Sequence, residues 1–161
     1  MGGTLRAAVG AACAIFDDGG RILLVHHSYG RLNWELPGGG AEPGEPPDQT
    51  AGRELLEETG IKASIGRLTG VYFELDQAHG AMLHFVFRCR WDPSVVPRAA
   101  SPEIAEVGYW PLDDLPTPIS DFTEVRIRDA WAGRPAAVMT IEARRWRTRS
   151  DGPGLPDDHM A

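Results

Sequence analysis

Four glutamates lie close to one arginine in the first half of this chain. They are Glu45, Glu54, Glu57 and Glu58, with Arg53 among them. The segment 50–59 contains few helix-breaking residues, and Gly60 is placed to end a helix in the left-handed conformation. On that helix Glu57 and Glu58 follow Glu54 by three and four positions, so the three carboxylates are expected to share one face.

Like charges at this spacing destabilise a helix, so something else must favour an acidic face of this kind. Oxygen ligands in excess of neutralising arginines suit Mg²⁺, with Mn²⁺ as a possible substitute. Mg²⁺ usually takes one or two carboxylates and keeps positions for water and substrate phosphates. The alternative interpretation is a solvated acidic surface. Ala51, Leu55 and Leu56 are left to face the core.

A glycine-rich turn, Gly38 to Gly40, precedes the acidic segment. Its backbone carbonyls can approach a metal or a phosphate without obstruction by Cβ atoms. A metal lowers the pKa of its bound water, and a glutamate within hydrogen-bond reach can take the proton. These groups together permit hydrolysis of a phosphoanhydride by attack of water at phosphorus.

The whole pattern resembles the complete Nudix box. Gly39 is followed by five residues, Glu45, seven residues and then Arg53-Glu54-Leu55-x-Glu57-Glu58-x-Gly60-Ile61. The preceding Trp34-Glu35-Leu36-Pro37-Gly38 resembles the lead-in to that box, and the rest of residues 5 to 133 resembles the family by pattern only. The order of predicted strands and helices indicates an α+β fold. The resemblance sharpens this to a Nudix-type α/β/α sandwich with a mixed β-sheet between helices.

The resemblance also implies roles for individual residues. Glu54, Glu57 and Glu58 would bind metal, with the carbonyl of Gly38 or Gly39 as a further ligand. Arg53 would pair with Glu45 or Glu54 and hold it in place, and Glu45 would be structural.

Some family members take a further ligand or base from a later loop. Glu103 is the first candidate here and Glu106 the second, against the alternative of solvent-exposed glutamates. The predicted catalytic residues are therefore Arg53, Glu54, Glu57 and Glu103.

Four further residues are candidates for substrate binding. They are His27, Trp34, Tyr72 and Phe73. His27 ends a predicted strand and could meet phosphate, with an ordinary half-exposed histidine as the alternative. The three aromatic residues could stack on a base. Aromatic residues in strands pack more often in the core, which is the alternative for these three.

The implied activity is Mg²⁺-dependent hydrolysis of a nucleoside diphosphate linked to another group, as in MutT-like pyrophosphohydrolases. Subgroup markers for ADP-ribose and diadenosine-polyphosphate hydrolases are absent, because Gln77 and His79 stand at their positions. Two other classes stay open: a catalytically silent module that senses a nucleotide, and a hydrolase of a non-nucleotide diphosphate. The intact glutamate set argues against the silent module.

Composition narrows the class of protein. The 161 residues carry a net charge of −7, which argues against a general binder of nucleic acid or of anionic membranes. The apolar run 7–16 is too short to span a bilayer and lacks a signal-peptide layout. Cys13 and Cys89 are expected to be buried structural thiols in a cytoplasmic protein. A monomer or homodimer with a small-molecule substrate is expected.

Periodicity predicts one domain over residues 1–149 and a flexible tail over 150–161. A β-hairpin is expected from 7–16 and 21–27, because an Asp/Gly turn joins two apolar runs. Other expected strands are 34–36, 62–75, 81–91, 106–110 and 137–146, and a second helix is expected at 119–131. The arginines of 144–149 are expected to form a solvated surface, or less expectedly to meet an anionic partner.

Overall fold

The computed structural model describes residues 3–4, 6–76 and 80–149. The predicted tail and the marker positions Gln77 and His79 lie outside these residues. In chain order the elements are β1 (Ala7–Ala14), β2 (Ile22–His27), β3 (Trp34–Glu35), β4 (Gly38–Gly40), α1 (Pro47–Thr59), β5 (Ala63–Asp76), β6 (Gly80–Trp91), β7 (Ile104–Trp110), β8 (Ile119–Ser120), α2 (Asp121–Ala132), β9 (Val138–Ile141) and β10 (Trp146–Arg147).

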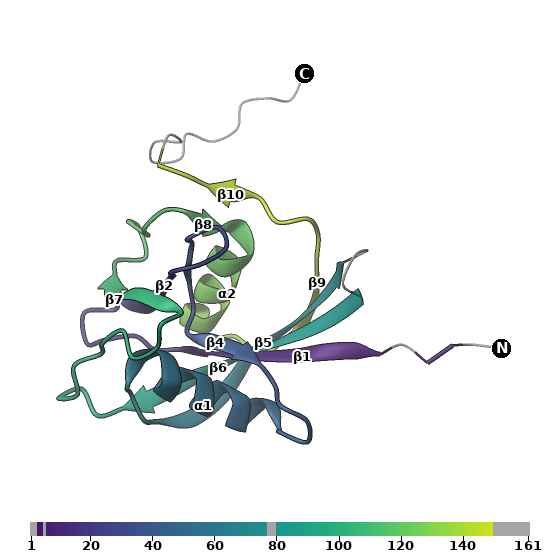
Figure 1. Cartoon of the computed structure of the whole chain (residues 1–161), viewed down its shortest axis with the longest axis horizontal. Helices are drawn as coiled ribbons and strands as arrows, with labels where there is room; N and C mark the ends of the chain where they lie inside the picture. The colour runs from purple at the N-terminus through teal and green to yellow at the C-terminus, as the bar shows by residue number, and fades with distance from the viewer. Residues whose placement is uncertain (1–2, 5, 77–79, 150–161) are drawn as a thin grey trace.

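A mixed five-stranded sheet, in the order β4-β1-β6-β5-β9, forms the centre of the molecule. β1 runs parallel to β6 and antiparallel to β4, and β5 runs antiparallel to β6 and parallel to β9. Helix α1 lies on one side of this sheet and α2 on the other (Figure 1). A smaller antiparallel sheet, β3-β2-β7, and the pair β10-β8 lie on the α2 side. The predicted α/β/α sandwich is confirmed.

Strand β1 and the residues after it divide the core in two. Ala11, Cys13 and Ile15 belong to the cluster packed under α1, whereas Ala12 and Ala14 belong to the cluster packed under α2. This alternation follows from the period of two along a strand, which points successive side chains to opposite faces. From Gly10 onward β1 is buried, because both of its faces are covered.

The predicted hairpin exists only at its turn. The Asp17 N–H donates the closing backbone hydrogen bond to the Arg21 carbonyl at 3.0 Å, and Phe16 bridges Ile22. Beyond the turn the two strands separate, β1 into the large sheet and β2 into the small one. The prediction of a continuous hairpin was wrong, because the apolar run of β2 from Ile22 to Val25 is fully buried and needs cover that one partner strand cannot supply.

Helix α1 begins at Pro47, whose missing N–H costs nothing in the first turn. It ends at Gly60, which has the left-handed φ of 72° that was expected. Ala51 and Leu55 are fully buried, as predicted. Leu56 is 46% exposed, so its assignment to the core was wrong. Successive helical residues are rotated by about 100°, which turns Leu56 away from the sheet.

The C-terminal part differs from prediction in two places. The single strand expected at 137–146 is two short strands, β9 and β10, joined by an irregular segment. Residues Ile119 and Ser120, expected to be helical, pair with β10, and α2 starts only at Asp121. Ser120 caps the helix, since the Thr123 N–H donates to its hydroxyl at 3.1 Å. In the described part of the chain, no helix is long and apolar enough to cross a membrane.

Both cysteines are free and buried, as expected. Although they are far apart in the sequence, the two side chains are in contact. The Cys89 thiol donates to the Cys13 sulfur, with the two sulfurs 2.9 Å apart. The contact arises because β1 and β6 are neighbouring parallel strands. This hydrogen bond, and after it burial, raises the pKa of Cys13, which keeps the thiol protonated and unreactive.

Candidate active site

The acidic face of α1 lies against strand β4, so the glutamates and the glycines of the motif meet in one place. The expected glycine turn is in fact this short strand, paired with β1 in register Gly38–Ala12, Gly39–Ala11 and Gly40–Gly10. Strand pairing fixes the backbone of these glycines. Their carbonyl and N–H groups are therefore held at defined positions beside the carboxylates.

Arg53 is the centre of this arrangement. Its guanidinium donates to both oxygens of Glu45, at 2.8 and 3.0 Å, to Glu54 at 2.9 Å and to Glu57 at 3.1 Å. It also donates to the carbonyl of Gly40 at 2.9 Å, which ties α1 to β4. Only the planar, five-donor guanidinium can make this set of contacts. The predicted pairing with Glu45 or Glu54 is thus a pairing with both.

Glu45 is held on all sides. Besides Arg53, the Thr50 hydroxyl and the Glu42 backbone N–H donate to it, at 2.9 and 3.0 Å. The hydrogen bonds from Arg53 lower the pKa of Glu45 to about 2, with smaller contributions from Glu42 and Thr50. A carboxylate with its oxygens so fully engaged has little capacity for another ligand, which supports a structural role.

Glu54 occupies the space that a side chain at residue 39 would need. A Cβ built on Gly39 would lie 2.5 Å from the Glu54 carboxyl, closer than any real contact. Burial raises the pKa of Glu54 against the opposing effect of Arg53, and the charges of Glu57 and Glu103 raise it further. Gly39 is thus required by the carboxylate beside it, and the motif glycine has a direct steric explanation.

Glu58 is the most deeply placed of the three glutamates, with only 6% of the residue exposed. Its carboxyl accepts a hydrogen bond from the Gly38 N–H at 2.9 Å. Burial raises its pKa to about 8 despite that bond, and the charges of Glu54, Glu35 and Glu103 add to the effect. Glu57 differs, because its side chain is 55% exposed while its carboxylate accepts from Arg53.

Glu103 reaches this site because its loop is attached to the end of α1. The N–H groups of Arg98 and Ala100 donate to the carbonyls of Thr59 and Glu58, both at 3.0 Å. Glu103 lies near enough to raise the pKa of Glu54 and of Glu58. Glu106 lies further along, on β7 opposite His26, and is exposed. The positions favour Glu103 over Glu106 as the additional ligand or base.

The donor chemistry of this site fits a hard divalent cation. Among the described residues, no three His, Cys, Asp or Glu side chains converge as a ready-made metal site, and Arg53 holds Glu54 and Glu57. Yet the carboxylates outnumber the arginine: Arg53 alone pairs with three glutamates, and the buried Glu58 makes a fourth. The carbonyl of Gly39 lies next to them, on the strand whose Gly38 N–H donates to Glu58. A surplus of oxygen ligands is what Mg²⁺ prefers.

A pocket of about 210 Å³ opens beside β4. His27 lines it, stacked on Tyr29 at 5.0 Å, and stays a candidate for substrate binding. Trp34 and Tyr72 lie instead in the core, 5% and 0% exposed. Trp34 stacks on His26, and the Tyr72 hydroxyl donates to Asp129 at 2.7 Å.

The positions of Trp34 and Tyr72 leave no open ring face for a base, so the alternative of core packing describes both. Phe73 is half-buried in β5 and does not line the pocket.

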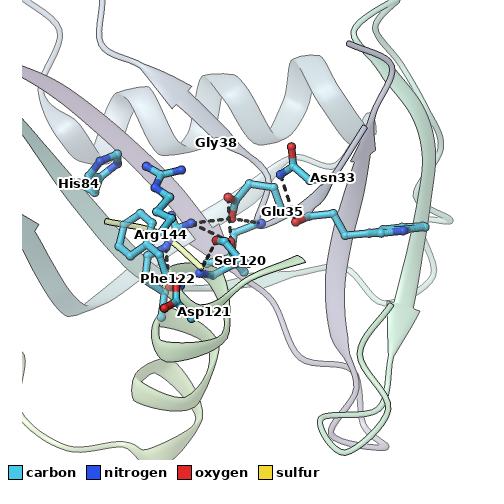
Figure 2. A network of polar contacts seen from close by, with 12 residues as sticks. Asn33, Glu35, Gly38, His84, Ser120, Asp121, Phe122 and Arg144 are labelled. Carbon is cyan, nitrogen blue, oxygen red and sulfur yellow. Dashed lines mark hydrogen bonds and ion pairs between the residues drawn. The ribbon is translucent and has the colours of Figure 1, made fainter. Parts of the chain in front are cut away.

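Sequence reasoning missed a buried polar network on the α2 side of the pocket. Arg126, 4% exposed, donates to Glu35 at 2.6 Å, and the Thr123 hydroxyl donates to the other Glu35 oxygen at 2.9 Å. Ser120 and Thr123 share a further hydrogen bond at 2.9 Å. Figure 2 shows this network around Glu35, with Phe122, Arg144 and His84 beside it. It connects β3, just before the glycine strand, to the first turn of α2.

Of the C-terminal arginines, Arg145 and Arg149 are exposed as expected, whereas Arg144 and Arg147 are half-buried. Arg144 donates to Glu74, Arg145 to Asp121 and Arg147 to Glu124. Arg145 alone of these three is strongly exposed, at 86%. The segment that carries them therefore lies along α2 and β5, and it brings Arg144 to the pocket.

Comparison with known proteins agrees with this geometry. Residues 6–130 match the model of the NUDIX domain family. A MutT-like protein of Streptomyces ambofaciens is 32% identical over 137 residues, which is 85% of each chain. A crystal structure of a MutT NUDIX hydrolase from Burkholderia pseudomallei superposes with a TM-score of 0.68 at 29% identity, covering 77% of this chain and 98% of that one.

Two other relatives match over a shorter segment. An ADP-ribose pyrophosphatase of Mycobacterium tuberculosis is 47% identical over 73 residues, 43% of this chain and 34% of that protein. A human diphosphoinositol polyphosphate phosphohydrolase 2 is 42% identical over 71 residues, 43% of this chain and 39% of that protein. The family match covers most of the chain, and the fold and the glutamate helix agree with it. The chain belongs to the Nudix family and is a Nudix hydrolase.

Proposed function

We propose that this protein hydrolyses a phosphoanhydride bond in a nucleoside diphosphate linked to another group, in a reaction that requires Mg²⁺. The observation that carries the proposal is the placement of Glu54, Glu57 and Glu58 on the α1 face beside the Gly38–Gly40 strand. The names of two relatives, a MutT-like protein and an ADP-ribose pyrophosphatase, fit such a substrate.

Glu54, Glu57 and Glu58, together with the carbonyl of Gly39, would hold the metal. When bound, Mg²⁺ lowers the pKa of a water molecule and neutralises phosphate oxygens. Ionisation of Glu58 is coupled to this, since a nearby cation favours the carboxylate that burial disfavours.

The other residues act by position. Arg53 keeps Glu54 and Glu57 oriented and holds α1 against β4 through the Gly40 carbonyl. Glu103 would accept the proton of the attacking water, because its loop brings an exposed carboxylate to the same site. Water attack at phosphorus then gives two phosphate-bearing products.

A catalytically silent module does not fit the intact glutamate set. A non-nucleotide diphosphate stays the alternative substrate, and the location in the cytoplasm and the monomeric or homodimeric state stay predictions.

The test is turnover of a substrate panel that contains ADP-ribose, the four deoxynucleoside triphosphates and a sugar diphosphate. EDTA should abolish turnover and Mg²⁺ or Mn²⁺ should restore it. In ¹⁸O-labelled water the label should appear on a phosphate group. Full activity in metal-free buffer, or label on carbon, contradicts the proposed mechanism.

A further inference from the structure

The pocket beside β4 extends over Gly10 toward β6. A Cβ built on Gly10 would lie 3.4 Å from the Gly39 carbonyl oxygen and 3.6 Å from Nδ1 of His84. Of the surrounding atoms only the flexible end of Met82 comes closer, at 2.8 Å. Because residue 10 has no side chain, the Gly39 carbonyl and Nδ1 of His84 lie close together on the wall of one pocket.

His84 presents a hydrogen-bond acceptor to this space. Its Nε2 lies 2.6 Å from Glu74, and Arg144 donates to the same carboxylate. Burial opposes ionisation of Glu74, but the bonds from Arg144 and His84 keep its pKa below the ordinary value. Burial lowers the pKa of His84. The imidazole is therefore neutral near pH 7, with its proton on Nε2 facing the carboxylate and a free lone pair on Nδ1.

Arg144 presents hydrogen-bond donors. Its Nε and Nη2 donate to the two oxygens of Glu74, at 3.0 and 2.7 Å, so that two of its five N–H groups are used. Its guanidinium lies 4.6 Å from the centre of the Phe122 ring, and both residues line the pocket. Figure 2 shows His84, Phe122 and Arg144 together. Within the described residues the other three N–H groups have no protein acceptor.

The charges of the pocket are balanced. Arg144 is matched by Glu74 and Arg126 by Glu35, and His84 is neutral. A strongly anionic group would therefore find no surplus positive charge here, and the carboxylates of α1 lie on the other side of Gly39. A neutral ring that carries both donors and acceptors on one edge satisfies the pocket. Nucleobases have such edges, whereas inositol polyphosphates do not.

We propose that this pocket binds the base of the substrate, with Nδ1 of His84 accepting a hydrogen bond from the base and Arg144 donating one to it. Glu74 is a positioning residue that orients both. The pocket excludes polyanionic groups, which separates this chain from relatives that act on diphosphoinositol polyphosphates. The inference rests on the proposed function, since it assigns the other half of the same substrate.

The experiment measures binding without metal, so that it does not depend on hydrolysis. AMP, GMP, CMP and UMP are titrated by calorimetry into the full chain and into His84→Gln, Arg144→Lys and Arg145→Lys. His84→Gln keeps an amide donor for Glu74 but loses the acceptor at Nδ1. Arg145→Lys is the matched control, because Arg145 lies on the same segment, is 86% exposed and pairs with Asp121.

Loss of one hydrogen bond corresponds to about a 5- to 10-fold weaker Kd. We expect at least one nucleotide to bind the wild type, the first two variants to weaken it by that factor, and the control to bind within about twofold. In turnover assays the same two variants should raise KM and leave kcat unchanged, as for a contact made equally before and during reaction. His84→Asn, which returns an oxygen near the Nδ1 position, should recover part of the loss.

Three outcomes overturn the inference: no binding of any nucleotide, equal binding by all variants, or a higher kcat/KM for diphosphoinositol pentakisphosphate than for every nucleotide. Nucleotide binding that depends on His84 and Arg144, but without hydrolysis of any nucleotide, supports the inference and contradicts only the proposed reaction. Thermal unfolding of each variant separates loss of binding from loss of folding.

Discussion

Arg53 and Arg126 each form the centre of a polar cluster, one on each side of the sheet, and the two clusters differ in charge and in exposure. Arg53 on α1 faces Glu45, Glu54 and Glu57 and is 24% exposed. Arg126 on α2 faces the single carboxylate of Glu35, and its side chain is 5% exposed. The first cluster carries an excess of negative charge and is partly exposed, whereas the second is balanced and largely buried in the wall of the pocket.

The difference shows how charge balance separates function from structure. The buried pair of Arg126 and Glu35 is balanced in charge and connects β3 to α2 through hydrogen bonds within the protein. It therefore requires no bound cation. An excess of carboxylates stays unfavourable until a cation arrives. Similar residue types thus form a structural connection in one place and a ligand site in the other.

Removing Arg126 should have the largest effect, and on stability. Arg126→Ala leaves the Glu35 carboxylate buried without its cation, which costs about 3–5 kcal/mol in the free energy of unfolding. Arg128→Ala is the control on the same helix, since Arg128 is 69% exposed and should change stability by less than about 0.5 kcal/mol. Urea unfolding measures both. Equal effects of the two substitutions would mean that the Glu35 network does not stabilise the fold.

The corresponding change in the open cluster should act on turnover instead. Glu57→Gln removes one charge with little change of shape, and we expect kcat to fall by about 10²–10³-fold. Stability without metal should stay equal or rise, because repulsion on α1 is relieved. Glu42→Gln, in the exposed loop before the helix, is the matched control. Unchanged kinetics and an unchanged response to Mg²⁺ in Glu57→Gln would leave the acidic face as a solvated surface.

Glu103 tests whether the loop after β6 belongs to the open cluster. Glu103→Gln should lower kcat by about 10²-fold if the carboxylate acts as base or ligand. Glu106→Gln, three residues later on β7, should stay near the wild type. Steady-state kinetics at saturating Mg²⁺ measures both. The reverse result, with only Glu106→Gln impaired, would transfer the role to Glu106.

The smallest effect, counted per pH unit, is a pH dependence of stability that comes from Glu58. Its pKa is about 8 in the folded chain, against 4.5 for an ordinary glutamate. Between these values the folded state holds a proton that the unfolded state has lost, so stability falls as pH rises, by at most about 1.4 kcal/mol per pH unit. In EDTA, Glu58→Gln should lack this decline. Parallel stability curves for the two proteins from pH 5 to 8 would show that Glu58 titrates normally.

The α1 cluster could be predicted because its residues follow each other at helical spacing. Arg53, Glu54 and Glu58 are neighbours in sequence and in space, and Gly39 is read from the same motif. The α+β class followed from the order of strands and helices, and the resemblance to the Nudix family sharpened it to the sandwich. Local spacing sufficed wherever the partners lie within one element or adjacent elements.

The α2 cluster could not be predicted for the opposite reason. Arg126 and Glu35 are 91 positions apart, and Arg144 and Glu74 are 70 apart, so no period or motif connects them. The sequence also did not show which face of a given strand is buried. Tyr72 and Trp34 have the residue types of a stacking platform, but only the packing of α2 and β7 against their strands decides that they are buried.

The C-terminal segment that supplies Arg144 has a consequence for ionic strength. It is held by the ion pairs of Arg144, Arg145 and Arg147 with Glu74, Asp121 and Glu124, and β9 alternates between exposed and half-buried residues. At 1 M salt the Debye length shrinks to about 3 Å, which weakens partly exposed pairs and leaves apolar burial intact. One wall of the pocket is therefore sensitive to salt, whereas the sheet that forms its floor is not.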